Sequence, residues 1–343
     1  MLAREFSIGG RQVGPGHPPY LIAEIGSNFD QSIAKAKCLI DHMAKAGVDA
    51  VKFQLFRADA MQPKGSELHR IFRSLELNPE WIQELSQHAA GQGLAFLASA
   101  FDGQSLTTLE QAGAQAHKLA SSEMVNFPLI DAMARTGKPL FLATGMCDLV
   151  DVAEAVHLCR VRGNDKVAIL QCAALYPLPP EEANLRTMDL FHATFGGPVG
   201  FSDHSLGIVL AIAAAARGAC VIEKHVTLDR NATGPDHFYA LEPHEMTELA
   251  RSLKMVHAAL GSSDKAMLPE EQRTGRRLGL YATRDIPQGG TIMAEDLTER
   301  RPAAGMRARY HAQVIGSRAT RDISRDEPIA WDAISFQEPI QVD

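Results

Sequence analysis

Charged and hydroxyl side chains recur at the ends of short apolar runs in the first two thirds of the chain. Lys52 and Lys118 each lie within or at the end of such a run, and the hydroxyls of Ser99, Ser121 and Ser202 follow others. Burying a charge is costly unless the charge is paired or used. Together, two lysines and several hydroxyls form a compact cationic cluster. Such a cluster suits a small dianion, for example a phosphorylated carboxylate.

Two histidines occupy equivalent positions at the ends of two later runs. His204 ends Ser202-Asp203-His204, and His225 ends Glu223-Lys224-His225. If these runs are neighbouring parallel strands, the two imidazoles meet on one divalent metal. Two protein ligands leave positions open for a substrate, which favours Lewis-acid catalysis over a structural site. Nitrogen ligands near oxygen atoms suit Mn²⁺, Zn²⁺, Fe²⁺ or Co²⁺. Glu223, on the same strand face as His225, is a weaker acid–base candidate.

The apolar runs themselves predict strands, because they are short and rich in β-branched, aromatic and aliphatic residues. Segments with helical spacing separate most of them, as in Ser32–Ala46 and in Pro79–Ala90, which Asn78 caps. Eightfold strand–helix alternation over this length predicts a closed (β/α)₈ TIM barrel of the α/β class. An open doubly wound sheet is the alternative, but its Gly-rich phosphate loop is missing after the first run. The expected strands are Tyr20–Ile25, Ala50–Gln54, Ala95–Ser99, Ala116–Ala120, Pro139–Thr144, Val167–Gln171, Val199–Ser202 and Ala219–His225.

The barrel positions the polar residues, since such barrels carry their chemistry at the C-terminal ends of the strands. We expect the barrel domain to span residues 1–260, with an N-terminal β-hairpin over Phe6–Val13 and a last helix over Pro243–Leu260. Residues 261–277 are polar and aperiodic, which is typical of a linker. Residues 278–343 form a small, mostly β domain with strand signals at Leu278–Ala282, Gln313–Thr320 and Ile329–Ile334.

Composition narrows the class of protein. The net charge of −7 over 343 residues argues against a nucleic-acid partner. Met1–Tyr20 contains no apolar signal core, and no run reaches the ~18 apolar residues of a membrane span. The five cysteines are odd in number and widely spaced, without a CxxC pair. Disulfides and a zinc–thiolate site are therefore not expected. We expect a cytoplasmic location.

The ordered motifs resemble the sialic acid synthase (N-acetylneuraminate synthase) family, and the C-terminal segment resembles that family's antifreeze-like (SAF) domain. The resemblance covers nearly the whole chain. The matching barrel segments are Ala23–Asn28, Val51–Gln54, Lys118–Glu123, Ala143–Met146, Gly200–Ser205, Glu223–His225 and Gly234–His237; the matching C-terminal pieces are Arg277, Asp285–Gly289 and Arg300–Pro302.

The resemblance implies a condensation of phosphoenolpyruvate with an open-chain N-acetylated hexosamine, such as N-acetylmannosamine or a dideoxy relative, to a nine-carbon keto-sugar acid and phosphate. It implies a divalent metal on His204 and His225, Mn²⁺ first, with Mg²⁺ or Co²⁺ as alternatives. Glu24, Glu123 or Lys52 would serve catalysis. Phosphoenolpyruvate would contact Lys52, Ser99, Lys118, Ser121 and Ser202. The sugar would contact Glu24, Gln54, Tyr176, Asp236 and Arg301.

The resemblance also implies a domain-swapped homodimer in which Arg301 reaches the sugar's acyl group in the other subunit. Three departures border the expected pocket: Ser99 replaces a threonine, Ala174 replaces an asparagine, and Phe238-Tyr239-Ala240 replaces a small serine-containing stretch. Two alternatives stay open. One is a deoxy-sugar acid synthase acting on another aldose or an aldose phosphate, which needs a second basic cluster. The other is a degenerate carbohydrate-binding barrel.

Overall fold

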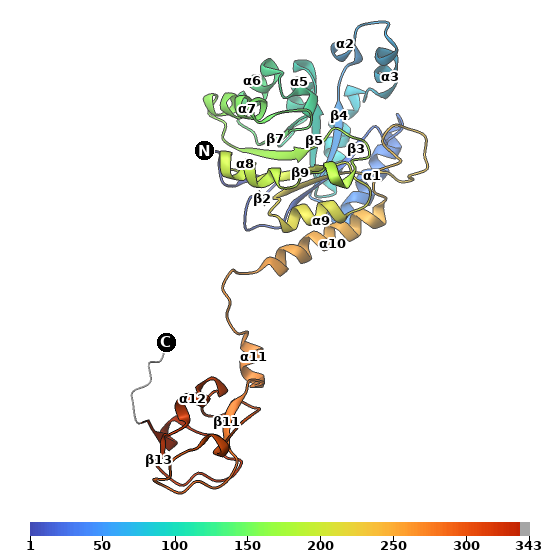
Figure 1. The fold of residues 1–343 in the computed structure, drawn as a ribbon. Helices are drawn as coiled ribbons and strands as arrows, with labels where there is room; N and C mark the ends of the chain where they lie inside the picture. Colours follow the sequence, from blue (N-terminus) through green and yellow to red (C-terminus); the bar gives the residue numbers. More distant parts are fainter. Residues whose placement is uncertain (337–343) are drawn as a thin grey trace. The chain divides into compact units, whose positions relative to one another are not determined.

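The first structural unit, Met1–Gly261, is built around a closed barrel of eight parallel strands (Figure 1). The computed structural model describes residues 1–336. Each strand pairs with its sequence neighbours, and β10 pairs with β3 to close the ring. The predicted TIM barrel is confirmed, with each strand within two residues of its expected bounds. The strands are β3 (Tyr20–Gly26), β4 (Ala50–Leu55), β5 (Ala95–Ala100), β6 (His117–Leu119), β7 (Leu140–Ala143), β8 (Val167–Cys172), β9 (Val199–Asp203) and β10 (Val221–His225).

Helices surround the strands (Figure 1). Each buries apolar side chains in the core around the barrel. In α1, Ser32 caps the N-terminus by accepting a hydrogen bond from the Lys35 amide, and Gly47 ends the helix in a left-handed conformation. Its residues Leu39, Ile40 and Met43 are fully buried. The barrel helices are α1 (Ile33–Ala46), α4 (Ile82–Gly91), α5 (Gly103–Gln111), α6 (Phe127–Arg135), α7 (Leu149–Val161), α8 (Thr187–Phe195), α9 (Val209–Ala216) and α10 (Pro243–Leu260).

The N-terminal end of the barrel is filled with apolar side chains. The predicted hairpin is present as β1 (Phe6–Ile8) and β2 (Arg11–Val13), which pair antiparallel around Gly9 and Gly10. Its residues Phe6, Ile8 and Val13 pack in one cluster with inward side chains of the barrel strands, such as Tyr20 and Phe141. The hairpin therefore closes this end of the barrel and leaves the opposite end for chemistry.

An excursion after β4 carries two extra helices, α2 (Ala58–Met61) and α3 (Glu67–Leu75), which project from the barrel in Figure 1. Phe56, at the start of the excursion, packs its ring edge-on against Phe72 of α3 at 5.4 Å and against Phe101, which follows β5, at 5.8 Å. These aromatic contacts hold the excursion close to the C-terminal ends of the neighbouring strands.

The second unit begins at Ser262 and has its own core, which includes Leu280, Ile292, Met306 and Ile329. Its elements are α11 (Pro269–Thr274), β11 (Gly279–Ala282), β12 (Leu297–Arg300), α12 (His311–Val314), β13 (Arg318–Ala319) and β14 (Ile334–Ser335). It is a small β-rich region, as predicted, and β12 carried no strand signal. The expected Gln313–Thr320 strand begins inside α12 and is a strand only at Arg318–Ala319, and the expected Ile329–Ile334 strand is a strand only at Ile334. The predicted small domain extends to 343, and residues 337–343 lie outside the described part.

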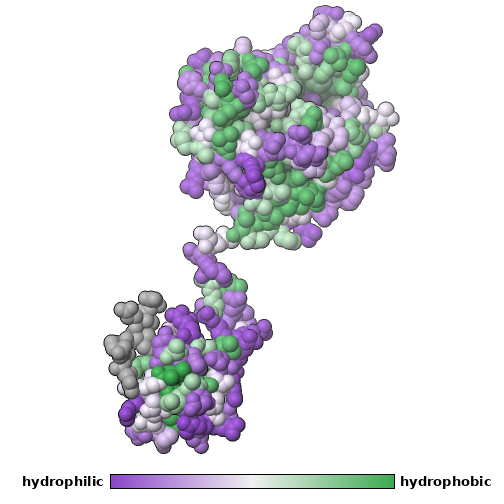
Figure 2. All heavy atoms as spheres, in the orientation of Figure 1, coloured by the Kyte–Doolittle hydropathy of each residue, from purple (hydrophilic) through white to green (hydrophobic). Residues whose placement is uncertain are grey.

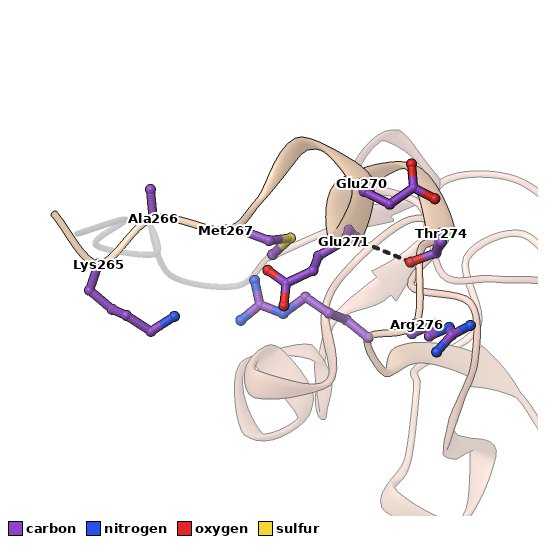
Figure 3. Close-up of a pocket in the computed structure, with 8 residues that line it drawn as sticks. Lys265, Ala266, Met267, Glu270, Glu271, Thr274 and Arg276 are labelled. Atoms are coloured by element: carbon purple, nitrogen blue, oxygen red, sulfur yellow. Dashed lines mark hydrogen bonds between the residues drawn. The ribbon is translucent and has the colours of Figure 1, made fainter. Parts of the chain in front are cut away.

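Residues 261–277, predicted as a linker, contain the short helix α11, whose first amide at Leu268 donates to Glu271 at 2.9 Å. A hollow of about 710 Å³ lies beside this helix, lined by Lys265, Ala266, Met267, Glu270, Glu271, Thr274, Arg276 and Arg277 (Figure 3). Charges of both signs line it and no barrel strand contributes to it, so it does not contain the predicted chemistry.

The surface of the barrel unit carries an apolar area over α9 and α10 (Figure 2). Leu206 just before α9, Val209 in α9, and Met255 and Leu260 in α10 are each more than half exposed. Exposed apolar areas of this kind often mark contacts with another protein surface. Among the described residues, no helix combines the length and apolar character needed to cross a bilayer.

Candidate active site

A pocket of about 230 Å³ lies at the C-terminal end of the barrel. It gathers ten of the residues singled out from sequence, which belong to six strands and to the loops that follow β6, β8 and β9. These residues are Glu24, Lys52, Gln54, Ser99, Lys118, Ser121, Tyr176, Ser202, His204 and His225. The predicted grouping of strand-end residues is thus what the barrel brings together.

Lys52 lies at the centre of the charged pocket floor. Its ammonium is 2.5 Å from a Glu24 carboxylate oxygen and 3.5 Å from Glu223, and it donates to the Ser99 hydroxyl at 3.1 Å. Burial alone would lower the pKa of Lys52, but the two carboxylates raise it, so the side chain stays charged. Burial raises the pKa of Glu24 above its usual range, despite Lys52 and a 3.0 Å hydrogen bond from Gln54.

Glu223 lies between the two lysines and was only a weak candidate from sequence. Its Oε1 atom is 3.6 Å from the Lys118 ammonium and accepts a hydrogen bond from Ser202 at 3.2 Å. Burial alone would raise the pKa of Glu223, but Lys118 and Lys52 lower it to about 2. Its other oxygen, Oε2, is buried without a hydrogen-bond partner. Burial lowers the pKa of Lys118, whose charge has fewer counterions than that of Lys52.

The two histidines face each other across the β9–β10 seam, with ring centroids 5.5 Å apart. His204 Nδ1 lies 2.9 Å from the Ala173 carbonyl, which can only accept, so Nδ1 is the nitrogen that carries the proton in the neutral form of the ring. The Tyr176 ring packs over His204 at 4.2 Å. Burial lowers the pKa of His225 to about 4, which keeps that imidazole neutral at neutral pH.

This donor set fits a divalent metal held by two imidazoles and completed by substrate or water. Neutral histidine whose second nitrogen is hydrogen-bonded is the usual form of a metal ligand. Within residues 1–336, no group of three or more His, Cys, Asp and Glu is placed to hold an ion without other ligands. His204 and His225 would therefore supply two positions only, and the remaining ones would face the pocket.

Asp236 approaches the pocket from the loop after β10, although it does not line it. Its Oδ2 atom accepts from Ser27 at 3.2 Å and lies 4.0 Å from His225, while Oδ1 accepts from the Tyr239 hydroxyl at 2.9 Å. Gly26 sits in this crowded corner with a positive φ of 54°, and a Cβ there would lie 3.0 Å from Asp236 Oδ2. Only glycine combines that backbone conformation with so little space.

Outside the barrel wall, a fully buried ion pair joins the two histidine-bearing strands. Lys224 of β10 is 2.9 Å from Asp203 of β9 and also donates to the Ser205 carbonyl. Asp203 in turn accepts from the Ser205 amide at 2.8 Å. Lys224 immediately precedes His225, and Asp203 immediately precedes His204. The ion pair therefore fixes the two strand ends that carry the imidazoles.

On the side of the pocket beside β6 and β8, the lining includes Ser121, Cys172 and Ala174. The Ser121 hydroxyl accepts from the Gly145 amide at 2.9 Å and donates to the Cys172 thiol at 3.6 Å. A second hollow of about 460 Å³ adjoins the pocket here and shares Met146, Cys172 and Ala174 in its wall. Ala174 thus lies in the wall that the two hollows share.

Two predicted residues of the barrel unit, Asp236 and Glu123, do not line this pocket. The Glu123 carboxylate accepts hydrogen bonds from Asn126 at 2.7 Å and from Ser122 at 3.3 Å, and it does not line the pocket. Arg301 belongs to the second unit, at the end of β12, where it is exposed.

Sequence reasoning missed several residues that shape the site. Phe56, Met61, Phe72 and Phe101 line the pocket as an apolar wall. Their signal was weak because three of them lie in or beside the α2–α3 excursion, which has no place in the strand–helix repeat. Tyr239 was named from sequence only as part of a departure that borders the pocket, and its place behind His225, where it is 1% exposed, was not predicted.

Comparisons with known proteins agree with this geometry. Residues 39–265 match the NeuB family and residues 278–335 match the SAF domain. The chain is 34% identical to the N,N'-diacetyllegionaminic acid synthase of Legionella pneumophila, over 92% of this chain and 94% of that protein. It is 35% identical to the human N-acetylneuraminate-9-phosphate synthase, over 84% of each chain.

A solved structure is also similar. The N-acetylneuraminic acid synthetase of Leptospira borgpetersenii aligns with a TM-score of 0.76 and 28% identity, over 79% of this chain and 95% of that one. The family match spans well over half of the chain, and it agrees with the strand-end cluster of lysines, carboxylates and histidines. The chain belongs to the NeuB family and is a nonulosonic acid synthase that condenses phosphoenolpyruvate with a sugar.

Proposed function

We propose that the protein condenses phosphoenolpyruvate with the open-chain form of an N-acetylated hexosamine, N-acetylmannosamine or a dideoxy relative, to a sialic-type acid and phosphate. The observation that carries this proposal is the pocket floor, where Lys52, Lys118, Glu24 and Glu223 are buried together beside two histidines. Such a group of charges is too costly to bury for packing alone. The relatives that make legionaminic acid and N-acetylneuraminate-9-phosphate support an amino sugar as acceptor.

Phosphoenolpyruvate would lie over the side of the pocket that carries both lysines. Lys52 and Lys118 offset its negative charge, and the hydroxyls of Ser99, Ser121 and Ser202 donate hydrogen bonds to its oxygens. Glu223 holds the two ammonium groups between which it lies, so the cluster is organised before the substrate arrives. This arrangement supports recognition of one compact anion.

The sugar would lie on the other side, above β3, β4 and β10, with its aldehyde facing the histidines. Gln54 and Tyr176 line that side, and Glu24 offers a carboxylate whose raised pKa suits proton transfer near neutral pH. Asp236 lies close to the same corner. A divalent cation on His204 and His225, Mn²⁺ as first choice, would polarise the aldehyde when bound.

The reaction balances without an oxidant or reductant. C3 of phosphoenolpyruvate forms the new C–C bond to the aldehyde carbon, and positive charge develops at C2. Water adds to C2, one of its protons ends on the former aldehyde oxygen, which becomes a hydroxyl, and the other leaves with the phosphate as the bond from C2 to the bridging oxygen breaks. Phosphate leaves with that oxygen, and C2 becomes the ketone. Glu24 is better placed than Glu123 to manage a proton, because Glu123 is engaged with Asn126 outside the pocket.

The active assembly would be a domain-swapped homodimer, in which Arg301 of the small unit reaches the sugar's acyl group in the other subunit. The apolar area over α9 and α10 supports self-association, since an exposed face of this kind favours burial against a second surface. Mixing Arg301→Ala chains with inactive His204→Ala chains, assayed at a sugar concentration well below the raised KM of Arg301→Ala, tests this arrangement. Partial recovery of activity after subunit exchange is expected. No recovery, with exchange confirmed by mass, would mean that each small unit serves its own barrel.

An aldose phosphate as acceptor has less support. Lys52 and Lys118 are the only lysine or arginine side chains among the pocket-lining residues, and both are needed for phosphoenolpyruvate. A second phosphate would lack a basic partner in the barrel.

The deciding experiment is phosphate release from phosphoenolpyruvate with Mn²⁺ and a panel of aldoses. The panel contains N-acetylmannosamine, an N-acetylated dideoxy hexose, N-acetylmannosamine 6-phosphate and arabinose 5-phosphate. We expect release with one of the unphosphorylated N-acetylated sugars. Preference for arabinose 5-phosphate would favour a deoxy-sugar acid synthase, and no release with any sugar would favour a carbohydrate-binding barrel.

A further inference from the structure

Tyr239 fills the space directly behind His225. Its ring centroid lies 5.0 Å from that of His225 and 5.6 Å from that of Tyr176, and the side chain is 1% exposed. The chain returns from the loop after β10 to the barrel at this point, because the Leu241 amide donates to the His225 carbonyl at 2.8 Å. The phenol is therefore fixed against the imidazole by both backbone and ring packing.

The hydroxyl of Tyr239 has two polar neighbours. It lies 2.9 Å from Asp236 Oδ1 and 3.3 Å from His225 Nδ1. A phenol has one proton to donate, and an ionised carboxylate can only accept. The proton therefore goes to Asp236, because otherwise two oxygen atoms would face each other at 2.9 Å with no hydrogen between them. The phenol oxygen is then the acceptor for a proton on His225 Nδ1.

This order of donors determines which nitrogen of His225 carries the proton in the neutral ring. With Nδ1 protonated toward Tyr239, Nε2 carries a free lone pair. The carbonyl of Ala173 fixes His204 in the same tautomer at 2.9 Å. Both imidazoles then present Nε2, which is the form in which two histidines can bind one cation.

We propose that Tyr239 is a positioning residue, the middle of a relay from His225 Nδ1 through the Tyr239 hydroxyl to Asp236 that fixes the tautomer and orientation of His225 for divalent-metal binding. Ser27 completes the relay by donating to the second oxygen of Asp236 at 3.2 Å. The relay assigns Asp236 a role behind the histidine, in addition to its proposed approach to the sugar. The inference deepens the proposed function, because it concerns the metal site of the same pocket.

The test uses the full-length chain and Mn²⁺ alone, titrated by calorimetry into the wild type, Tyr239→Phe and Tyr20→Phe. Tyr239→Phe keeps the ring and removes only the hydroxyl. Tyr20→Phe is the matched control, because its buried hydroxyl has no hydrogen-bond partner and lies in the apolar cluster at the opposite end of the barrel. We expect Tyr239→Phe to bind Mn²⁺ roughly 10- to 100-fold more weakly, the usual effect of losing an outer-shell partner. Tyr20→Phe should bind as the wild type does.

A positioning role predicts rescue as well. Excess Mn²⁺ should restore most of the turnover of Tyr239→Phe, whereas a general loss of packing would not respond to metal. Binding of Mn²⁺ by Tyr239→Phe within twofold of the wild type would overturn the inference. This result leaves the proposed condensation intact. Conversely, a wild-type protein that binds Mn²⁺ tightly but condenses no sugar would refute the proposed function while leaving the relay standing.

A second measurement does not depend on any variant. Nitrogen-15 NMR of the histidine rings in the metal-free wild type reports which nitrogen carries the proton. We expect His225 to be neutral with the proton on Nδ1, with assignment by comparison to His225→Gln. A proton on Nε2 in the metal-free protein would contradict the relay, because Tyr239 would then have nothing to accept.

Discussion

The two ends of one barrel differ sharply although the same strands run through both. Toward the N-terminal end, inward side chains are apolar, as with Tyr20 and Ile22 of β3 or Val221 of β10. A few residues further along the same strands, the inward positions hold Glu24, then Glu223 and His225. Both ends are formed by the same eight parallel strands. The change in residue type therefore marks the functional end of the barrel. Buried charges there lower stability and are tolerated only when they are paired or used.

The two ends therefore have different roles, one in stability and one in catalysis. The hairpin side chains and the apolar cluster stabilise one end by burial. The other end keeps four charged groups whose attractions are satisfied among themselves until a substrate arrives. Substitutions at the two ends should therefore fail in different ways, which the following variants test.

The largest expected effect is that of His204→Ala on turnover. A cation acting as Lewis acid contributes several kcal/mol to the barrier, so loss of one of its two protein ligands should lower kcat/KM by roughly 10³- to 10⁴-fold. A chelator should have the same effect on the wild type. Thermal unfolding should stay close to that of the wild type in both cases. Full activity of the His204→Ala variant or of the chelated wild type would show that the reaction does not need a metal on His204.

Phe141→Ala probes the opposite end. Phe141 is fully buried, with its ring 6.3 Å from those of Phe6 and Tyr20. Its truncation should reduce the free energy of unfolding by about 3–5 kcal/mol, measured by denaturant titration. The folded fraction should keep a nearly unchanged KM for phosphoenolpyruvate. A large rise in that KM with little loss of stability would break the division between the two ends.

Lys118→Ala should cost about 2–4 kcal/mol of transition-state stabilisation, the range for one preorganised electrostatic group. The KM for phosphoenolpyruvate should rise more than that for the sugar. Lys64→Ala, at an exposed lysine in the α2–α3 excursion, is the control and should change neither. An effect confined to the sugar would move Lys118 out of the phosphoenolpyruvate site.

Arg301→Ala should have the smallest effect, a rise of roughly 10- to 100-fold in the sugar KM, because one hydrogen bond from a charged group contributes roughly 1.5–3 kcal/mol. Phosphoenolpyruvate binding should change less. Arg325→Ala supplies a matched exposed arginine of the same unit. Equal behaviour of the two variants would leave Arg301 without a role in sugar binding.

The sequence was informative where periodicity and position act together. Each barrel strand is a short apolar run between helices, and a polar residue at its end, such as Lys52 or His204, points to the pocket by location alone. It was less informative where a side chain has a local alternative. Glu123 follows β6 as predicted, yet the Asn126 amide at the start of α6 binds its carboxylate away from the pocket.

Other features depend on contacts that no local pattern encodes. Tyr239 reads as a loop residue, and only the return of the chain at Leu241 brings it behind His225. Strands β13 and β14 are two residues long each, too short for an alternation signal, so the small unit was predicted in class but not in detail. The carboxylate of Asp236 could be expected near the sugar, but not its engagement by Ser27 and Tyr239.

The central claim is the joining of phosphoenolpyruvate to an N-acetylated hexosamine, and one mass measurement tests it directly. Phosphoenolpyruvate labelled with ¹⁸O at the bridging oxygen is incubated with the protein, Mn²⁺ and the accepted N-acetylated sugar. The account predicts a keto-sugar acid three carbons longer than the sugar, with the label in the released phosphate. Unchanged sugar, or a product without the three added carbons, would contradict it.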